Sequence, residues 1–395
     1  MMEIMKKKVP LRFLRALLTL AILFVITFAT QSAFAISVSG PSSPVPTAAM
    51  KLVGFCEDPK GKLDEDAVNV LVNYVLENKS VKEVNLPKIR EATGAYYEFD
   101  TRISFVNFLK YSYNQQIPSA LTSPSSIRYS IWNGLPGKSQ KMPANWETLL
   151  PIGKPVIIRG IQRDAITPDL TTGVYYEYEL QRTLILLNHK GKKVLITISK
   201  QIDRSNVGKK GAIIGSDDDW NYYYSDEPGS LKKGLGWVKA YIYDFFSVGV
   251  YVETGASSFV VRSGVFQWIR AGWSGVNFVQ SGHIIKGMKR YGRNFKEILE
   301  SPALPPADQI AAAYQKFYAL PNSDIRLHYV ALQEAQKALA IQSGKINKPQ
   351  IKKPNISDNV SRGQMIEELM LEYLKIVMGK NSLLEKKQVL ALINS

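Results

Sequence analysis

The sequence has little of what most enzymes use for covalent and metal chemistry. It has one cysteine, Cys56, so no disulfide can form within a chain. Its three histidines, at positions 189, 283 and 328, lie more than 40 positions apart, and a His-x-x-x-His zinc pattern is absent. We therefore expect a fold held by its core, with Cys56 as a small buried side chain and His189 as a solvated turn residue, and no cofactor.

Short catalytic motifs are missing as well. The sequence has no Gly-x-Ser-x-Gly nucleophile elbow and no phosphate-binding loop that ends in Gly-Lys-Ser/Thr. It resembles no protein family closely enough to name one. These absences favour a protein that is not an enzyme.

The first 35 residues have the three parts of a secretory signal peptide. A basic start from Lys6 to Arg15 is followed by an apolar run from Leu17 to Ala29 and by the small-x-small site Ala33-Phe34-Ala35. We predict cleavage after Ala35 and a periplasmic or extracellular location. The apolar run is shorter than the roughly 20 residues of a spanning helix, so no membrane span is expected after cleavage.

The mature chain remains basic. Removal of residues 1–35 lowers the formal net charge from +16 to +12, and residues 228–299 hold ten bases against three acids. Such a surplus favours peripheral contact with an anionic envelope surface or polymer. Nucleic acid is not expected as a partner, because export separates the protein from it.

Hydrophobic periodicity predicts an α+β fold with a central antiparallel β-sheet, a packed central helix, a helical N-terminal lead-in and a helical C-terminal appendage. Residues 262–280 are expected to be that buried helix, and Pro87 to open a short helix that Gly94 closes. The predicted parts are a signal peptide (1–35), a disordered tether (36–47), a helical lead-in (48–150), a central β-rich domain with buried and basic helices (151–299), a helical hairpin (300–342), a basic linker (343–357) and C-terminal helices (358–395).

Four basic residues share one face of a predicted helix over residues 283–299. They stand at i, i+3, i+4 and i+7, and apolar residues fall on the opposite face. An ordinary solvated face of a docked helix is the alternative. The predicted anion-binding residues are Lys286, Lys289, Arg290 and Arg293.

Residues 208–236 predict a long loop with aromatic side chains. Loops of this length are usually functional or mobile. The loop begins the most aromatic part of the chain, because residues 220–299 hold 17 of the 41 aromatic residues. The residues expected to contact a partner or ligand are Trp220, Tyr222, Tyr223 and Tyr224.

The same loop contains acidic residues that faintly resemble a calcium site. Alternate oxygens come from Asp217, Asp219 and Asn221. Tyr222 replaces the glycine of the calcium-loop turn, and Pro228 stands where the bidentate glutamate belongs. We therefore expect a solvated turn and no bound metal.

Asp244 and Glu253 are the candidates for catalytic carboxylates. Asp244 lies among aromatic residues, where its pKa could rise, and a second carboxylate nine residues on could complete an acid and base pair for glycoside hydrolysis. Alternatively, Asp244 pairs with Arg262 or Arg270, or points to water.

Three hypotheses follow from these patterns. The leading one is an exported, non-enzymatic periplasmic or cell-envelope protein that binds an anionic envelope component or a partner protein through the basic helix and the aromatic loop. The first alternative is an envelope glycan hydrolase that uses Asp244 and Glu253. The second is an assembly component that docks through its C-terminal helices.

Overall fold

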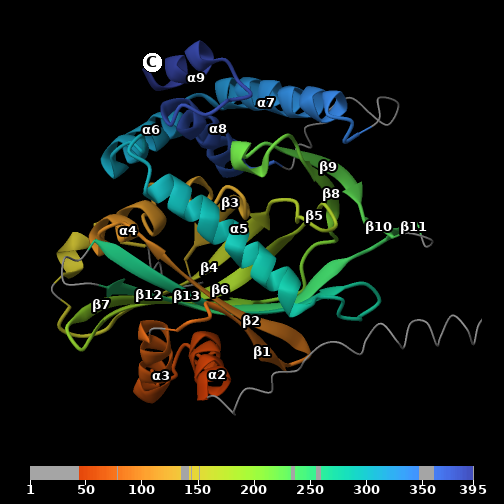
Figure 1. The fold of residues 1–395 in the computed structure, drawn as a ribbon. Coiled ribbons are helices and arrows are strands. Elements are labelled where there is room, and N and C mark those ends of the chain that lie inside the picture. Colours follow the sequence, from red (N-terminus) through yellow and green to blue (C-terminus); the bar gives the residue numbers. More distant parts are fainter. Residues whose placement is uncertain are drawn as a thin grey trace, which may run out of the picture. The chain divides into compact units, whose positions relative to one another are not determined.

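An eight-stranded antiparallel sheet forms the centre of the fold, here given by a computed structural model (Figure 1). All neighbouring strands in it are antiparallel. In spatial order its strands are β1 (Glu83–Ile89), β2 (Ala92–Thr101), β13 (Val260–Gly272), β12 (Tyr241–Thr254), β7 (Lys192–Gln201), β6 (Glu177–His189), β4 (Val156–Ile166) and β3 (Ile127–Asn133).

The structure describes residues 44–77, 79–134, 142–143, 145–150, 152–232, 236–254, 259–346 and 360–394. The predicted signal peptide, the tether up to residue 43 and the linker from residue 347 lie outside these ranges. Residues from Pro44 onward belong to one unit, and the domain boundaries predicted within it stay predictions.

Helices α2 (Pro44–Glu57) and α3 (Glu65–Leu76) cover one face of the sheet (Figure 1). The Asp64 side chain caps α3 by accepting a hydrogen bond from the Ala67 amide at 2.8 Å. The α+β class, with its antiparallel sheet and terminal helices, is confirmed. The start of α2 at Pro44 shows that the predicted disordered tether extended too far.

The predicted lead-in contains strands as well as helices. β1 and β2 form a hairpin whose turn residues, Arg90 and Glu91, both have positive φ. The helix expected from Pro87 to Gly94 is therefore wrong. Gly94 is needed for a close approach, because a Cβ there would stand 2.4 Å from Nε1 of Trp268. The helical parts are α4 (Phe105–Ser112) and the short η1 (Ser119–Leu121) and η2 (Glu147–Leu149).

The buried helix expected over residues 262–280 is also wrong. Most of that segment is strand β13, which pairs with both β12 and β2. Phe266 and Trp268, two residues apart, point into the same core, whereas Ser263 lies on the other face. This alternation has the two-residue period of a strand. The sequence pattern was ambiguous because tryptophan and phenylalanine also suit a buried helix.

The described residues between 208 and 236 form small sheets rather than a long loop. β5 (Val174–Tyr175), β8 (Lys209–Ile213) and β9 (Tyr222–Pro228) make one sheet, and β10 (Ser230–Lys232) pairs with β11 (Gly236–Val238). A single helical turn, η3 (Asp217–Asp219), joins β8 to β9.

The second face of the central sheet is crossed by α5 (Ser281–Leu299), which packs mainly on β2 (Figure 1). Beyond it lie α6 (Ala307–Ala319), α7 (Asn322–Gln342), α8 (Arg362–Val377) and α9 (Lys386–Asn394). None of the helices in the described ranges is long and apolar enough to cross a membrane.

α8 is the most buried of the C-terminal helices and carries buried charges. Glu368 accepts hydrogen bonds from Arg128 of β3 at 2.9 Å and from the Tyr329 hydroxyl of α7 at 3.1 Å. Lys375, only 1% exposed, pairs with Glu372 at 2.6 Å. These bonds join α8 to the sheet and to α7, so the C-terminal helices are part of the core rather than a free docking arm.

Glu367 on the same helix lacks a cationic partner among the described residues. One of its oxygens accepts a hydrogen bond from the Ser130 amide at 2.9 Å. Burial raises the pKa of Glu367 to about 8, with smaller contributions from Asp164 and Glu368. Because this pKa is higher in the folded chain than in the unfolded one, folding retains a proton on Glu367 at neutral pH.

We predict that Glu367→Gln stabilises the protein increasingly as the pH rises. The contribution of protonated Glu367 is complete below an ordinary glutamate pKa of about 4.3 and declines by about 1.4 kcal/mol per pH unit until the folded pKa is reached. The difference in unfolding midpoint between variant and parent should grow between pH 5 and pH 8 and then level off. Thermal unfolding across this range measures it, with Glu334→Gln on the exposed side of α7 as control. A difference that is constant with pH would contradict the assignment.

Candidate functional site

The face of the sheet under α2 and α3 is filled with large apolar side chains. Side chains alternate between the two faces along each strand, so β12 and β13 each contribute one set to this face. Phe246, Val248, Phe266 and Trp268 are fully buried there. The rings of Phe246 and Trp268 stack with centroids 5.3 Å apart. This face has a structural role.

The opposite face carries a row of small and polar side chains. The strand register pairs each member of the row with the next, from β4 through β6, β7, β12 and β13 to β2. Neighbouring strands are about 4.8 Å apart, so the four central members span roughly 14 Å. In spatial order the row is Gly160, Arg182, Ser199, Ser247, Gln267 and Ala95.

Short side chains leave room above the middle of this row. Ser199 and Ser247 end at one hydroxyl, while larger residues flank them along the strands. Phe245 and Tyr178 stand on one side, with ring centroids 5.9 Å apart, and Tyr251 stands on the other. The result is a stretch of short polar side chains between aromatic ones across the central strands. We call it the trough and define it by Tyr178, Arg182, Ser199, Phe245, Ser247 and Gln267.

Solvent reaches the trough, and several of its polar groups are not used inside the protein. Arg182, Phe245, Ser247 and Gln267 are half-buried, whereas Ser199 is 6% exposed. No described residue forms a hydrogen bond with the side chain of Ser247 or Gln267. Polar groups on a core-facing surface are ordinarily satisfied, so their free capacity marks a place for a ligand or for ordered water.

Arg182 is the charged group of the trough. Its Nη1 donates to Oε1 of Gln162 at 3.0 Å, and its buried Nε has no partner among the described residues. The carboxylate of Asp164 also interacts with Arg182, but burial raises the pKa of Asp164. Oδ1 of Asp164 is already bonded to the hydroxyl of Ser130 at 2.7 Å. Arg182 therefore has donor capacity left over.

Three tyrosines adjoin the end of the trough near α4 and α5. The hydroxyl of Tyr251 contacts those of Tyr113 and Tyr291. Burial raises the pKa of Tyr113 and of Tyr291 well above the ordinary value, although Arg182 lowers both in part. Arg182 is thus close to Tyr113 and Tyr291, so this end of the trough has hydroxyl groups near a cation.

The trough residues were not predicted from the sequence. They come from four strands, and only the strand register brings them together. One signal was available: Arg182 lies two residues before Leu184 and four before Leu186, both buried on the same face. A cation at a core-facing strand position needs a partner or a function.

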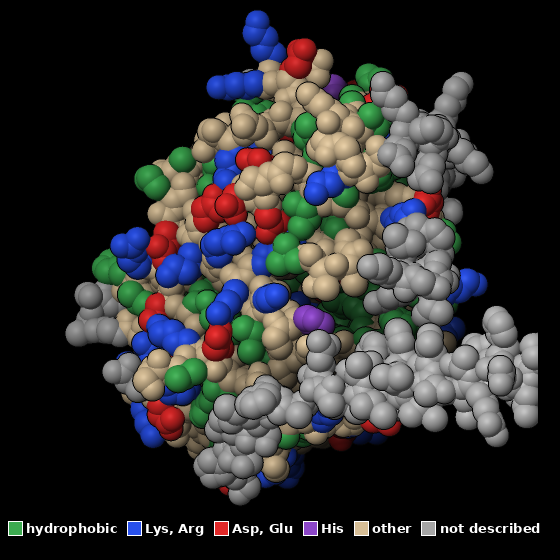
Figure 2. Space-filling model, turned by 45° about the vertical axis from the view of Figure 1, so that its right-hand side comes forward, with side chains coloured by type: hydrophobic (Ala, Val, Ile, Leu, Met, Phe, Trp, Pro, Cys, Tyr) green, Lys and Arg blue, Asp and Glu red, His purple; other side chains and the backbone are tan. Residues whose placement is uncertain are grey.

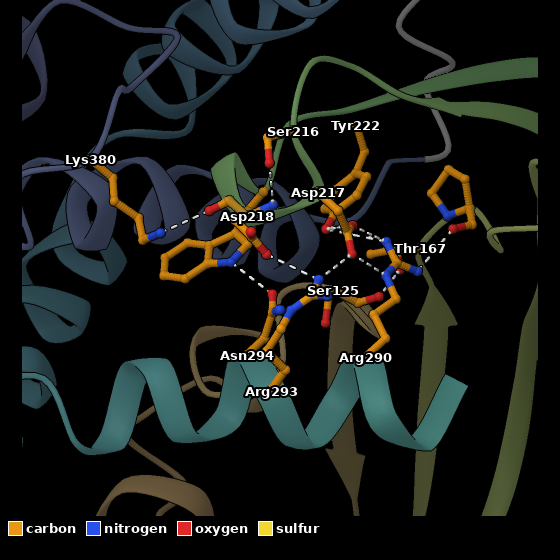
Figure 3. A network of polar contacts seen from close by, with 12 residues as sticks. Ser125, Thr167, Ser216, Asp217, Asp218, Tyr222, Arg290, Arg293, Asn294 and Lys380 are labelled. Carbon is orange, nitrogen blue, oxygen red and sulfur yellow. Dashed lines mark hydrogen bonds and ion pairs between the residues drawn. The ribbon is translucent and has the colours of Figure 1, made fainter. Parts of the chain in front are cut away.

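The predicted anion-binding residue Arg290 lies inside the protein (Figure 3). It is 7% exposed, its Nε donates to Asp217 at 2.7 Å, and its Nη1 donates to the carbonyl of Pro168 at 3.2 Å. Burial lowers the pKa of Arg290, but the bond to Asp217 and other contacts raise it overall. Arg290 of the predicted basic helix and Asp217 of the predicted acidic loop thus form an ion pair.

The other basic residues of α5 remain on the surface, with two of the three already paired. Arg293 binds Asp218 at 3.0 Å, and Lys289 forms an ion pair with Glu83. Lys286 is exposed and has no ion-pair partner among the described residues. Figure 2 shows basic side chains interspersed with acidic ones on this side of the molecule rather than gathered in a uniform patch. Binding of an external anion by this helix stays a prediction for Lys286, Lys289 and Arg293.

The predicted aromatic loop packs inward. Trp220 is 1% exposed and donates from Nε1 to Oδ1 of Asn294 at 2.8 Å (Figure 3). Tyr222 is buried as well, whereas Tyr223 and Tyr224 on the same strand are half-buried. Trp220 and Tyr222 therefore attach the turn η3 to α5 and do not form an exposed recognition loop.

The weak metal candidates have other partners. Asp217 is bound to Arg290, and Oδ1 of Asn221 accepts a hydrogen bond from buried Lys375 at 2.8 Å. Asp219 is half-buried nearby. Within the described ranges, no group of three or more His, Cys, Asp or Glu side chains could hold a metal ion.

The two candidate catalytic carboxylates are not brought together. Asp244 pairs with Lys200, and Glu253 pairs with Lys193 at 3.0 Å. They lie nine residues apart on one strand, which puts their side chains on opposite faces and about 30 Å from each other along the strand. A glycosidase needs both carboxylates in one cleft within about 10 Å. The structure thus removes the basis of the hydrolase alternative.

The predictions for the single residues His189 and Cys56 have different outcomes. His189 is 6% exposed, with Nε2 3.2 Å from Oδ1 of Asn73, so the expectation of a solvated histidine is wrong. Packing of the turn against α3 covers it. Cys56 is fully buried, as expected, and burial raises the pKa of its thiol to about 11.

We predict that Arg290→Ala lowers the free energy of unfolding by about 3–5 kcal/mol, because it leaves Asp217 partly buried without a cation. Urea unfolding measures this loss. Lys286→Ala on the exposed side of the same helix is the control and should change stability by less than about 0.5 kcal/mol. Adding Asp217→Asn to Arg290→Ala should recover part of the loss. Equal effects of Arg290→Ala and Lys286→Ala would contradict the pairing.

Comparison with known proteins identifies no family for this chain. No protein-family model matches it, and neither does any curated protein. Among solved structures, the human StarD13 (DLC2) lipid transfer and protein localization domain aligns with 60% of this chain and 98% of its own length, at 11% sequence identity and a TM-score of 0.26. A TM-score of that size is below what a shared fold requires, so no property of that domain is transferred to this chain.

Proposed function

We propose that this chain is an exported, non-enzymatic binding protein that holds a ligand in the trough. The observation that supports this most directly is the row from Arg182 to Gln267, where hydrogen-bonding groups stand half-exposed and unused across the middle of a sheet. The other face of the same sheet is mainly apolar, and its buried Glu98 and Thr183 are bonded to Tyr96 and Cys56. Unused polar groups beside aromatic side chains are typical of ligand sites.

The trough supports binding better than catalysis. Its serines, Ser199 and Ser247, have no described histidine, lysine or carboxylate as a hydrogen-bond partner. A serine nucleophile needs such a base. The proposed ligand is therefore held and released without chemical change.

Export is proposed from the first 35 residues alone. We predict that the protein isolated from its native cells begins at Ile36, because Ala33-Phe34-Ala35 has the pattern of a signal-peptidase site. The intact mass of the native protein measures this start. Recovery of the uncleaved chain from the cytoplasm would contradict the proposed location but not the binding function.

We predict that the trough binds the neutral fluorescent probe N-phenyl-1-naphthylamine, and that Ser247→Phe abolishes this binding. Phenylalanine at position 247 would occupy the space above the central serines. A fluorescence titration measures saturation and affinity for the parent and the variant. Ser323→Phe makes the same exchange at an exposed position at the start of α7 and should leave binding unchanged.

Two results would overturn the proposed function. One is the absence of saturable binding to the parent protein. The other is equal binding by Ser247→Phe and the parent when circular dichroism shows that both are folded.

A further inference from the structure

We infer that the ligand of the trough is an organic anion, with its carboxylate, sulfonate or phosphate group on Arg182 and its apolar body against Phe245 and Ile269. This inference rests on the proposed binding function and specifies its ligand class. It depends on three features: a guanidinium with spare donors, hydroxyls in the same region, and an apolar wall beside them.

The cationic end is formed by Arg182. A guanidinium has five N–H donors in a planar fork that matches an oxyanion. One hydrogen bond, to Gln162, is the only one it makes with a described residue. Arg182 is half-buried, and an ion pair of a partly buried charge is screened less than one on an open surface. The geometry favours an anion over a neutral ligand.

The apolar wall is formed across two strands. Phe245 of β12 pairs directly with Ile269 of β13, and both are half-buried on the trough side. Val265, four residues before Ile269 on the same strand, is half-buried on the same face. On this face, the pair Phe245 and Ile269 is the next one along the strands after Ser247 and Gln267 of the polar row. A ligand can therefore contact both the wall and Arg182. Val265 and Ile269 also pack against the cluster that contains Ile284 and Met288 of α5, and a purely inorganic anion would make no apolar contact with Phe245.

The competing anion site is the exposed side of α5. Lys286 is its unpaired cation, and that site has no apolar wall comparable to Phe245 and Ile269. Substitution of each cation separately therefore distinguishes a ligand in the trough from general attraction to a basic helix.

The test compares two probes that differ by one charged group. 8-Anilino-1-naphthalenesulfonate is N-phenyl-1-naphthylamine with a sulfonate added, so the ratio of their affinities isolates the contribution of the anion. In the parent protein the sulfonate probe should bind about ten- to a hundredfold more tightly, the usual effect of a charge-assisted hydrogen bond. Arg182→Gln should remove this preference while neutral-probe binding persists, and Arg182→Lys should retain part of it. Lys286→Gln should leave it unchanged.

The outcomes separate the two proposals. If the parent binds the neutral probe and shows no preference for the sulfonate, the trough is a binding site but the anion inference is overturned. The inference is also overturned if the preference for the sulfonate probe survives Arg182→Gln. Loss of that preference in Lys286→Gln would instead assign the anion to α5. If Arg182→Gln no longer binds the neutral probe, Arg182→Lys decides: a sulfonate preference that Arg182→Lys retains at least in part supports the cation, and complete loss of the preference in Arg182→Lys overturns it. If neither probe binds the parent, the proposed function itself fails.

Discussion

The alternation of side chains along the central strands determines most of this structure. A residue of β12 faces either α2 and α3 or the side crossed by α5, and the two sets have opposite chemistry. Phe246, Val248 and Val250 fill one side completely. Ser247 and Gly249, between them in sequence, leave the other side shallow and polar. One strand thus supplies a core on one face and a candidate binding surface on the other.

Some of the basic residues that suggested an anion-binding surface in the sequence are paired with acidic residues inside the folded protein. Arg290 and Asp217 form a buried ion pair, and Lys375 and Glu372 form another on α8. Pairs of this kind are costly to break but add little net stability, since desolvation offsets most of the attraction. Their role is better understood as specificity, because the first joins α5 to the turn η3 and Lys375 of the second also binds Asn221 just after that turn.

The sequence was sufficient for elements whose pattern is local. The periodicity of residues 283–299 predicted α5, with the start two residues late and the end at the right residue. It failed at β13, where Phe266 and Trp268 suited both a helix and a strand. The four bases of α5 were correctly placed on one helix, but nothing nearby in sequence revealed that Asp217, 73 positions before Arg290, would pair with that arginine. The trough was beyond reach for the same reason, since Arg182, Ser199, Ser247 and Gln267 become neighbours only through strand register.

The contrast between Arg182 and Arg290 is what makes the trough the stronger candidate for function. Both guanidinium groups stand where apolar residues would pack more easily, so each needs a compensating interaction. Arg290 has one in Asp217 and is closed to solvent. Arg182 has one amide partner and the nearby carboxylate of Asp164, whose pKa is raised by burial, and it is half-buried beside apolar side chains. Because the described residues leave this cation incompletely paired, we propose that it has a partner from outside.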